Sequence, residues 1–124
     1  MNQKIKVKSM YDYHFDILGI KVVNNYNYKE SVELSEGIIL DFDDNGVPVA
    51  LEVLDASKVF GIQEKQYLSN RRQINMNIEI TSTNISLDLK IIYQKHNNKK
   101  TSTVNYLTLN DINAPVMNEE LATV

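Results

Sequence analysis

The chain has 124 residues, of which 43% are hydrophobic and 23% charged. This length suits one small globular domain and is too short for a two-domain enzyme with a dedicated cofactor fold, so we expect residues 1–124 to form a single compact unit. The net charge of −3 is too weak to imply a nucleic-acid or membrane partner, and we expect neither. The absence of cysteine excludes disulfides, thiolate metal sites and cysteine nucleophiles.

The first residues predict no targeting segment. Between Lys4 and Lys8, lysines alternate with aliphatic residues and leave no continuous apolar stretch, unlike a signal peptide. No run of about 18 apolar residues, the length of a membrane-spanning helix, occurs anywhere in the chain. We therefore expect a cytoplasmic protein.

Apolar side chains recur at every second position in the first half, a period typical of β-strands. The pattern predicts strands from Ile5 towards Tyr11, over 17–23, over 37–42 and over 47–53. Between the last two lies Asn45-Gly46, a pair that readily takes the positive φ angles of a tight hairpin. Residues 1–60 are expected to form one β-rich segment.

A short helical connector is expected to follow this segment. Asp55 begins, and Gly61 ends, a sequence typical of a single capped helical turn, and residues 63–68 are good helix formers without a breaker. We assign the connector to residues 61–70. It separates the first segment from a β-rich extension over residues 71–124.

The extension predicts a β-meander. Apolar residues alternate over 74–80 and over 85–91, and Val104 and Tyr106 mark a third strand after the polar turn 95–100. The chain after Pro115 is expected to be irregular, with 118–121 as a helical turn. The predicted fold is mainly β, either all-β or β-rich α+β: an antiparallel sheet or small sandwich of about seven strands with one short connecting helix.

The motifs of the first half resemble a known family. Tyr11-Asp12 precedes the run Asp16-Ile17-Leu18-Gly19-Ile20, an aliphatic run that begins at Gly37 leads into an acidic hairpin, and residues 52–57 read Glu-Val-Leu-Asp-Ala-Ser. This pattern resembles the domain of unknown function 2283 family over about residues 4–60, and the remainder resembles the extension of longer archaeal members. The family usually has tyrosine where Gly19 stands. The resemblance implies a small prokaryotic β-rich domain and brings no established activity, cofactor or catalytic residue.

The acidic hairpin also matches a calcium-loop motif. Asp41, Asp43, Asn45, Gly46 and Glu52 have the spacing of an EF-hand loop. The residues on both sides alternate as strands, whereas an EF-hand needs flanking helices. We therefore interpret the segment as a hairpin and assign no metal ligand.

A second candidate gathers two carboxylates and an imidazole in six residues. Asp12, His14 and Asp16 are spaced two residues apart. If they line one face of a strand, they could act as an acid–base pair or as half of a metal site. The alternative is a hairpin turn in which Tyr11, Tyr13 and Phe15 point inward and the polar side chains face water. We favour the turn.

Other motifs of catalysis are missing from the sequence. The serines have no nucleophile motif, and the four glycines are too far apart to form a phosphate loop.

The chain has two basic clusters, Arg71-Arg72 and the turn Lys95–Lys100. They could contact a phosphate or RNA, with Tyr93 or Tyr106 for stacking, although we favour a solvated face. Tyr26 and Tyr28 are interpreted as a rigid loop or strand edge.

These observations favour a non-catalytic binding or interaction module. We assign no catalytic, cofactor-binding or metal-binding residue and no cofactor. Exposed strand edges predict a homo-oligomer, and a small protein partner is a further option. Two alternatives stay open. One is a small carboxylate- or metal-dependent enzyme that uses Asp12, His14 and Asp16. The other, which follows from toxin-like genes beside some family members, is an antitoxin-like partner of a small toxin.

Overall fold

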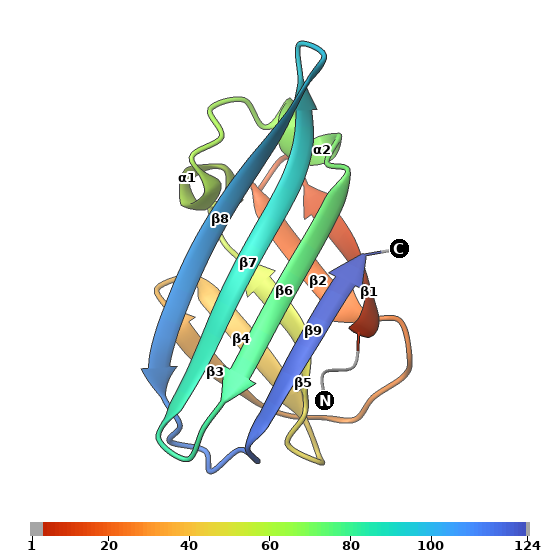
Figure 1. Cartoon of the computed structure of the whole chain (residues 1–124). Helices are drawn as coiled ribbons and strands as arrows, with labels where there is room; N and C mark the ends of the chain where they lie inside the picture. Colours follow the sequence, from red (N-terminus) through yellow and green to blue (C-terminus); the bar gives the residue numbers. More distant parts are fainter. Residues whose placement is uncertain (1–3, 124) are drawn as a thin grey trace.

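Nine β-strands form one mixed sheet in the computed structural model, which describes residues 4–123 (Figure 1). The strands are β1 (Lys4–Asp12), β2 (Ile17–Val22), β3 (Tyr28–Ser35), β4 (Ile38–Asp43), β5 (Pro48–Val53), β6 (Gln73–Ile80), β7 (Asn84–Lys95), β8 (Asn98–Leu109) and β9 (Met117–Thr123). Their order in the sheet is β3-β4-β5-β2-β1-β9-β6-β7-β8. Two short helices, α1 (Ala56–Phe60) and α2 (Gln66–Ser69), lie between β5 and β6 in the chain.

The sheet curls around one hydrophobic core. Strands β6 to β9 cross in front of β1 to β5 in Figure 1, and the two edge strands, β3 and β8, lie near each other. The inward residues of both halves, such as Leu18 and Phe42 from the first and Ile78 and Leu87 from the second, belong to the same buried cluster. The predicted alternation therefore describes these strands well, since every second residue enters the core.

The predicted strand number was too low, because β3 and β9 were not expected as strands. β3 is an edge strand in which exposed and half-buried residues alternate, with Leu34 alone fully buried, so its apolar pattern is weak. In β9, Glu119 and Glu120 interrupt the apolar alternation. The prediction of an irregular segment or a helical turn over 118–121 is wrong for the same reason.

The sheet was expected to be antiparallel, and it is mixed, because β9 pairs in parallel with β1. On its other side, β9 pairs antiparallel with β6. The last strand of the chain thus joins the first strand to the meander β6-β7-β8. This meander itself is confirmed.

The hairpin between β4 and β5 is confirmed, with a longer turn than expected. Gly46 has a φ angle of 76°, whereas Asn45 is not among the residues with positive φ. The Asp43 side chain organises the turn, because its Oδ1 accepts hydrogen bonds from the backbone N–H groups of Asn45 and Val47, each at 2.9 Å. Thus glycine alone supplies the left-handed conformation.

We expect the substitution Gly46→Ala to lower the free energy of unfolding by about 2–4 kcal/mol, through backbone strain and a clash. A Cβ atom at Gly46 would lie 2.7 Å from Cδ of Pro115. Gly61 is the matched control, because its φ angle of 67° is similar while its Cβ position has no neighbour within 4 Å. Gly61→Ala should cost only the strain, about 1–2 kcal/mol. Urea denaturation of both variants measures the difference, and equal losses would contradict the clash.

The remaining turns and helices differ from the prediction in length. β7 and β8 continue through most of the predicted turn 95–100, so that only His96 and Asn97, both with positive φ, connect them. The expected helical turn is α1, which ends at Gly61 as predicted. α2 forms a second, separate helix, and it begins later than the predicted segment 63–68.

Candidate functional site

The turn after β1 contains a buried carboxylate that connects three parts of the chain. The Asp16 side chain is only 8% exposed. Its Oδ1 accepts a hydrogen bond of 2.6 Å from the Tyr11 hydroxyl, and its Oδ2 accepts one of 2.6 Å from Ser57 Oγ. The backbone N–H of Ser57 also donates to this carboxylate, at 3.1 Å to Oδ1. Tyr11, Asp16 and Ser57 therefore form one network, which joins β1, its turn and α1.

Asp16 takes the capping role that the sequence assigned to Asp55. Asp55 precedes α1 with a left-handed backbone and makes no side-chain hydrogen bond to the helix. The Asp16 carboxylate instead accepts from the Ser57 N–H, and the Asp16 carbonyl accepts from the N–H of Ala56 at 2.9 Å. The first N–H groups of a helix have no partner inside it, so a residue from another turn satisfies them here.

Hydrogen bonds keep Asp16 charged despite its burial. Burial opposes the charged form, but hydrogen bonds from Ser57 and Tyr11 outweigh it and hold the pKa of Asp16 below its ordinary value. Burial and the hydrogen bond to Asp16 together raise the pKa of the Tyr11 phenol. The phenol therefore stays protonated as a donor, and the network has no group poised to exchange a proton near neutral pH.

The three side chains of the enzyme alternative do not converge. β1 ends at Asp12, so Asp12, His14 and Asp16 do not share one strand face, which the enzyme alternative requires. Asp12 Oδ1 accepts from the N–H of Phe15 at 3.0 Å within the turn, while the His14 side chain is exposed and contacts the Phe15 ring. Over residues 4–123, no group of three or more metal-ligating side chains comes together.

The interpretation that we favoured for this segment, a hairpin turn with inward aromatic rings, was wrong in part. Tyr13 and Phe15 were expected to point inward, yet they are 57% and 65% exposed. Tyr11 is half-buried, as expected for an inward residue of β1. The side chain that enters the protein beside it is the polar Asp16, because the turn breaks the two-residue period of the strand.

The residues of the calcium-loop motif lie on a hairpin, as predicted. The Asp43 carboxylate is used by its own turn. Asp41 Oδ1 accepts a hydrogen bond of 2.6 Å from Ser31 Oγ, which in turn lies 2.8 Å from the Tyr28 hydroxyl. Tyr28 is the first residue of the edge strand β3, and Tyr26 lies in the preceding loop. Both positions agree with the interpretation of the two tyrosines as a loop or strand edge.

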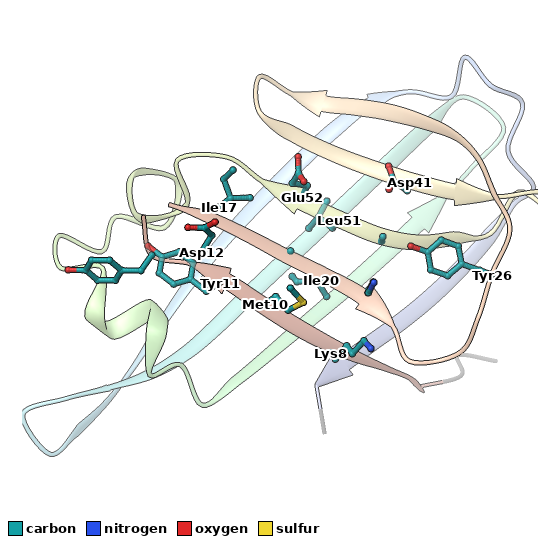
Figure 2. A pocket seen from close by; sticks show the side chains of 14 residues that line it. Lys8, Met10, Tyr11, Asp12, Ile17, Ile20, Tyr26, Asp41, Leu51 and Glu52 are labelled. Atoms are coloured by element: carbon teal, nitrogen blue, oxygen red, sulfur yellow. The ribbon is translucent and has the colours of Figure 1, made fainter. Parts of the chain in front are cut away.

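A hollow of about 700 Å³ lies on the outer face of β1, β2 and β5 (Figure 2). We call it the outer hollow. Its lining residues are Lys8, Met10, Tyr11, Asp12, Tyr13, Ile17, Gly19, Ile20, Lys21, Tyr26, Asp41, Ala50, Leu51 and Glu52. In Figure 2, Tyr26 lies at one end, Asp12 at the other, and Met10 between them.

Two small residues on the outer face give the outer hollow its depth. Gly19 on β2 pairs with Met10 on β1 and with Glu52 on β5, and Ala50 pairs with Lys21 in the adjacent row. The space above Gly19 is open, because a Cβ atom there would meet only the Met10 carbonyl oxygen, at 3.9 Å. A larger side chain at either position would reduce this space.

Charged groups of both signs surround the outer hollow. Lys8 and Lys21 lie directly opposite each other on β1 and β2, both exposed, and like charges in this position repel each other. Asp12, Asp41 and Glu52 lie further around it. The lysine pair favours a bound negative charge at its end of the hollow.

The family model described as "Protein of unknown function (DUF2283)" matches residues 8–57. A Methanosarcina mazei protein described as "Putative hypoxanthine phosphoribosyltransferase" is 36% identical over 107 residues, which are 86% of this chain and 85% of that protein. The chain belongs to the DUF2283 family. This result confirms the resemblance, and Tyr11, Asp16 and Ser57 all lie within the matched segment.

A second relative carries no functional description. The uncharacterized protein MJ0789 of Methanocaldococcus jannaschii is 34% identical over 87 residues, which are 70% of this chain and 73% of that protein. No solved structure matches significantly. In the described part of the chain, none of the helices has the length and apolar character needed to cross a membrane.

Proposed function

We propose that the protein is a non-catalytic binding module whose ligand site is the outer hollow. The observation that carries this proposal is a hollow of about 700 Å³ over Gly19 and Ala50, in a family without an established activity. Sites for small molecules in proteins typically have volumes of roughly 300–1,000 Å³. The ligand we infer is a small amphipathic molecule with an aromatic or apolar body and one anionic group.

The walls of the outer hollow support this choice of ligand. Met10 is 69% exposed, and its flexible thioether adapts to apolar and aromatic groups. Tyr26 offers a ring at one end (Figure 2). The anionic group would lie between Lys8 and Lys21, where it relieves the repulsion of the lysine pair. The family pattern usually has tyrosine at this position, and Gly19 leaves the space open in this chain.

The position of the polar groups favours binding over catalysis. Asp16 is committed to the network with Tyr11 and Ser57, and His14 and Asp12 lie apart from it. The phosphoribosyltransferase name belongs to the Methanosarcina relative, and we do not transfer it to this chain.

We retain the homo-oligomer as part of the proposal, because Leu107 and Leu109 on the edge strand β8 are exposed.

Filling the hollow tests the proposal. We expect Gly19→Tyr to weaken binding of the aromatic anion 1-anilinonaphthalene-8-sulfonate at least tenfold, because the ring occupies the space above β2. Gly19 lies in a regular strand without positive φ, so a β-favouring side chain should change the free energy of unfolding by no more than about 1 kcal/mol. Fluorescence titration measures the affinity, and urea denaturation measures the stability.

Two controls separate the hollow from the rest of the surface. Gly19→Ala adds one methyl group in open space and should keep most of the affinity. Asn77→Tyr places the same ring on the outer face of β6, opposite Asp88 and Glu120, and should leave the affinity unchanged. Equal dye binding by the folded Gly19→Tyr variant would overturn the assignment. Transfer of a phosphoribosyl group to hypoxanthine by the purified protein would overturn the non-catalytic function.

A further inference from the structure

A second, basic pocket lies where β9 ends, between β1 and the beginning of β6. Its volume is about 330 Å³. Three hydroxyl-bearing residues line it from three different segments: Ser9 on β1, Ser69 at the end of α2 and Thr123 on β9. Arg71 and Arg72 line it from the short link between α2 and β6. We call this pocket the arginine notch. It shares Lys8 with the outer hollow, and its other lining residues are different.

Arg71 is held in place within the arginine notch. Its Nε donates a hydrogen bond of 2.8 Å to Ser9 Oγ, and its Nη1 donates one of 2.9 Å to the carbonyl oxygen of Leu68. The side chain is half-buried, and burial lowers the pKa of Arg71, with Tyr11 acting in the opposite direction. Among residues 4–123, no carboxylate contributes to this shift. Partial burial of a cation is unfavourable unless an anion pairs with it. The partners of Arg71 in the described part of the chain are a hydroxyl and a carbonyl oxygen, so the pocket is suited to receive a negative charge.

We propose that the arginine notch binds a phosphoryl anion, either inorganic phosphate or the phosphate group of a small molecule. Guanidinium groups bind phosphate oxygens through two parallel hydrogen bonds. Arg71 is already oriented by Ser9 and Leu68, and Arg72 brings a second positive charge to the same pocket. The hydroxyls of Ser69 and Thr123 can contact further oxygens, which suits a phosphate better than a carboxylate with two oxygens.

The second basic segment of the chain has no comparable setting. Lys99 and Lys100 lie at the start of β8, are exposed, and belong to a hairpin that projects from the sheet (Figure 1). The sequence treated both basic clusters alike, as solvated faces with phosphate or RNA contact as the alternative. In the second cluster Lys95 is half-buried and lines a smaller pocket, but Glu64 lines that pocket too, and the Lys95 ammonium lies over the Tyr67 ring. Lys99 and Lys100 therefore provide a charge-matched control.

Titration with inorganic phosphate and with adenosine monophosphate tests the proposal. We expect saturable binding of at least one of these probes by isothermal titration calorimetry, competition by sulfate, and little competition by acetate. Arg72→Gln should weaken binding at least fivefold, and Arg71→Gln at least tenfold. The double variant Lys99→Gln/Lys100→Gln removes the same number of charges elsewhere and should leave the affinity unchanged.

The two probes also distinguish the sources of the phosphoryl group. Equal affinity for both indicates that the phosphate alone is recognised, and tighter binding of adenosine monophosphate indicates a phosphorylated small molecule. Since Arg71 contacts Ser9 and Leu68, its variant could lose stability. Arg72 is exposed and gives an independent variant, and amide NMR shifts of Ser9, Gln73 and Thr123 in the unmodified protein locate the bound probe.

Two results would overturn the proposal: no saturable binding of either probe, or an equal loss of affinity in the Lys99/Lys100 variant. Gly19→Tyr should not affect phosphate binding, and Arg72→Gln should not affect the dye in the outer hollow. The failure of one site therefore leaves the other assignment intact.

Discussion

Asp16→Asn should lower the free energy of unfolding by about 3 kcal/mol or more, although it replaces only one heavy atom of the side chain. The carboxylate accepts hydrogen bonds from Tyr11, from Ser57 Oγ and from the Ser57 N–H, and bonds to a charged group typically contribute about 1.5–3 kcal/mol each. An amide keeps one acceptor oxygen and places an NH₂ group against donors. Urea denaturation with circular dichroism measures the loss.

Asparagine isolates the effect of the charge from that of the backbone. Asp16 has a φ angle of 57°, a conformation that asparagine tolerates and alanine does not. Asp12→Asn is the matched control in the same turn, because the Asp12 carboxylate accepts one hydrogen bond, from the exposed N–H of Phe15. It should lose no more than about 1 kcal/mol. Similar losses for the two variants would mean that the buried network does not stabilise the fold.

The stabilisation by Asp16 depends on pH in a defined direction. The pKa of Asp16 in the folded protein is lower than its ordinary value of 3.8, so the unfolded chain binds the proton more readily. The contribution is therefore complete above that ordinary value, and it is lost as the pH falls through the lowered pKa of the folded state. The stability difference between the unmodified protein and Asp16→Asn should shrink over this acidic range.

Local patterns predicted the parts of the fold that depend on neighbouring residues. The strands β6 and β7 and their meander follow from the two-residue period, and the β4–β5 hairpin follows from Gly46 in an acidic turn. The weakly apolar edge strand β3 was missed. β9 was missed because its pairing with β1 joins residues far apart in sequence, such as Lys4 and Glu120, and two adjacent glutamates conceal its alternation.

The candidate sites show the same limit. The sequence grouped Asp12, His14 and Asp16 because they are close in the chain, yet the turn separates their side chains. Asp16 instead meets Ser57, 41 residues away, and no local pattern predicts this contact. The outer hollow depends on β2 lying between β1 and β5, which are not consecutive strands. The departure at Gly19 from the family pattern was the one signal in the sequence that pointed to it.

Removal of β9 should abolish cooperative folding. β9 lies between β1 and β6, the strands through which the two halves of the sheet join. In a chain that ends at Val116, the backbone groups of β1 and β6 would lose the hydrogen-bond partners that Met117 to Thr123 provide. The core residues next to Leu121 would also become exposed. Because a buried backbone group without a hydrogen bond is costly, we expect no sigmoidal thermal transition by circular dichroism and strong dye binding typical of loose packing.

Single substitutions in β9 distinguish loss of the strand from a general effect of truncation. Leu121 is 2% exposed within the common core, and Leu121→Ala should lower the free energy of unfolding by about 2–5 kcal/mol. The neighbouring Glu120 is exposed and faces the opposite side of the strand, so Glu120→Ala should stay within about 0.5 kcal/mol of the unmodified protein. A chain lacking β9 that still unfolds cooperatively would show that the two halves have independent cores, and that the parallel pairing of the first and last strands is not what holds this sheet together.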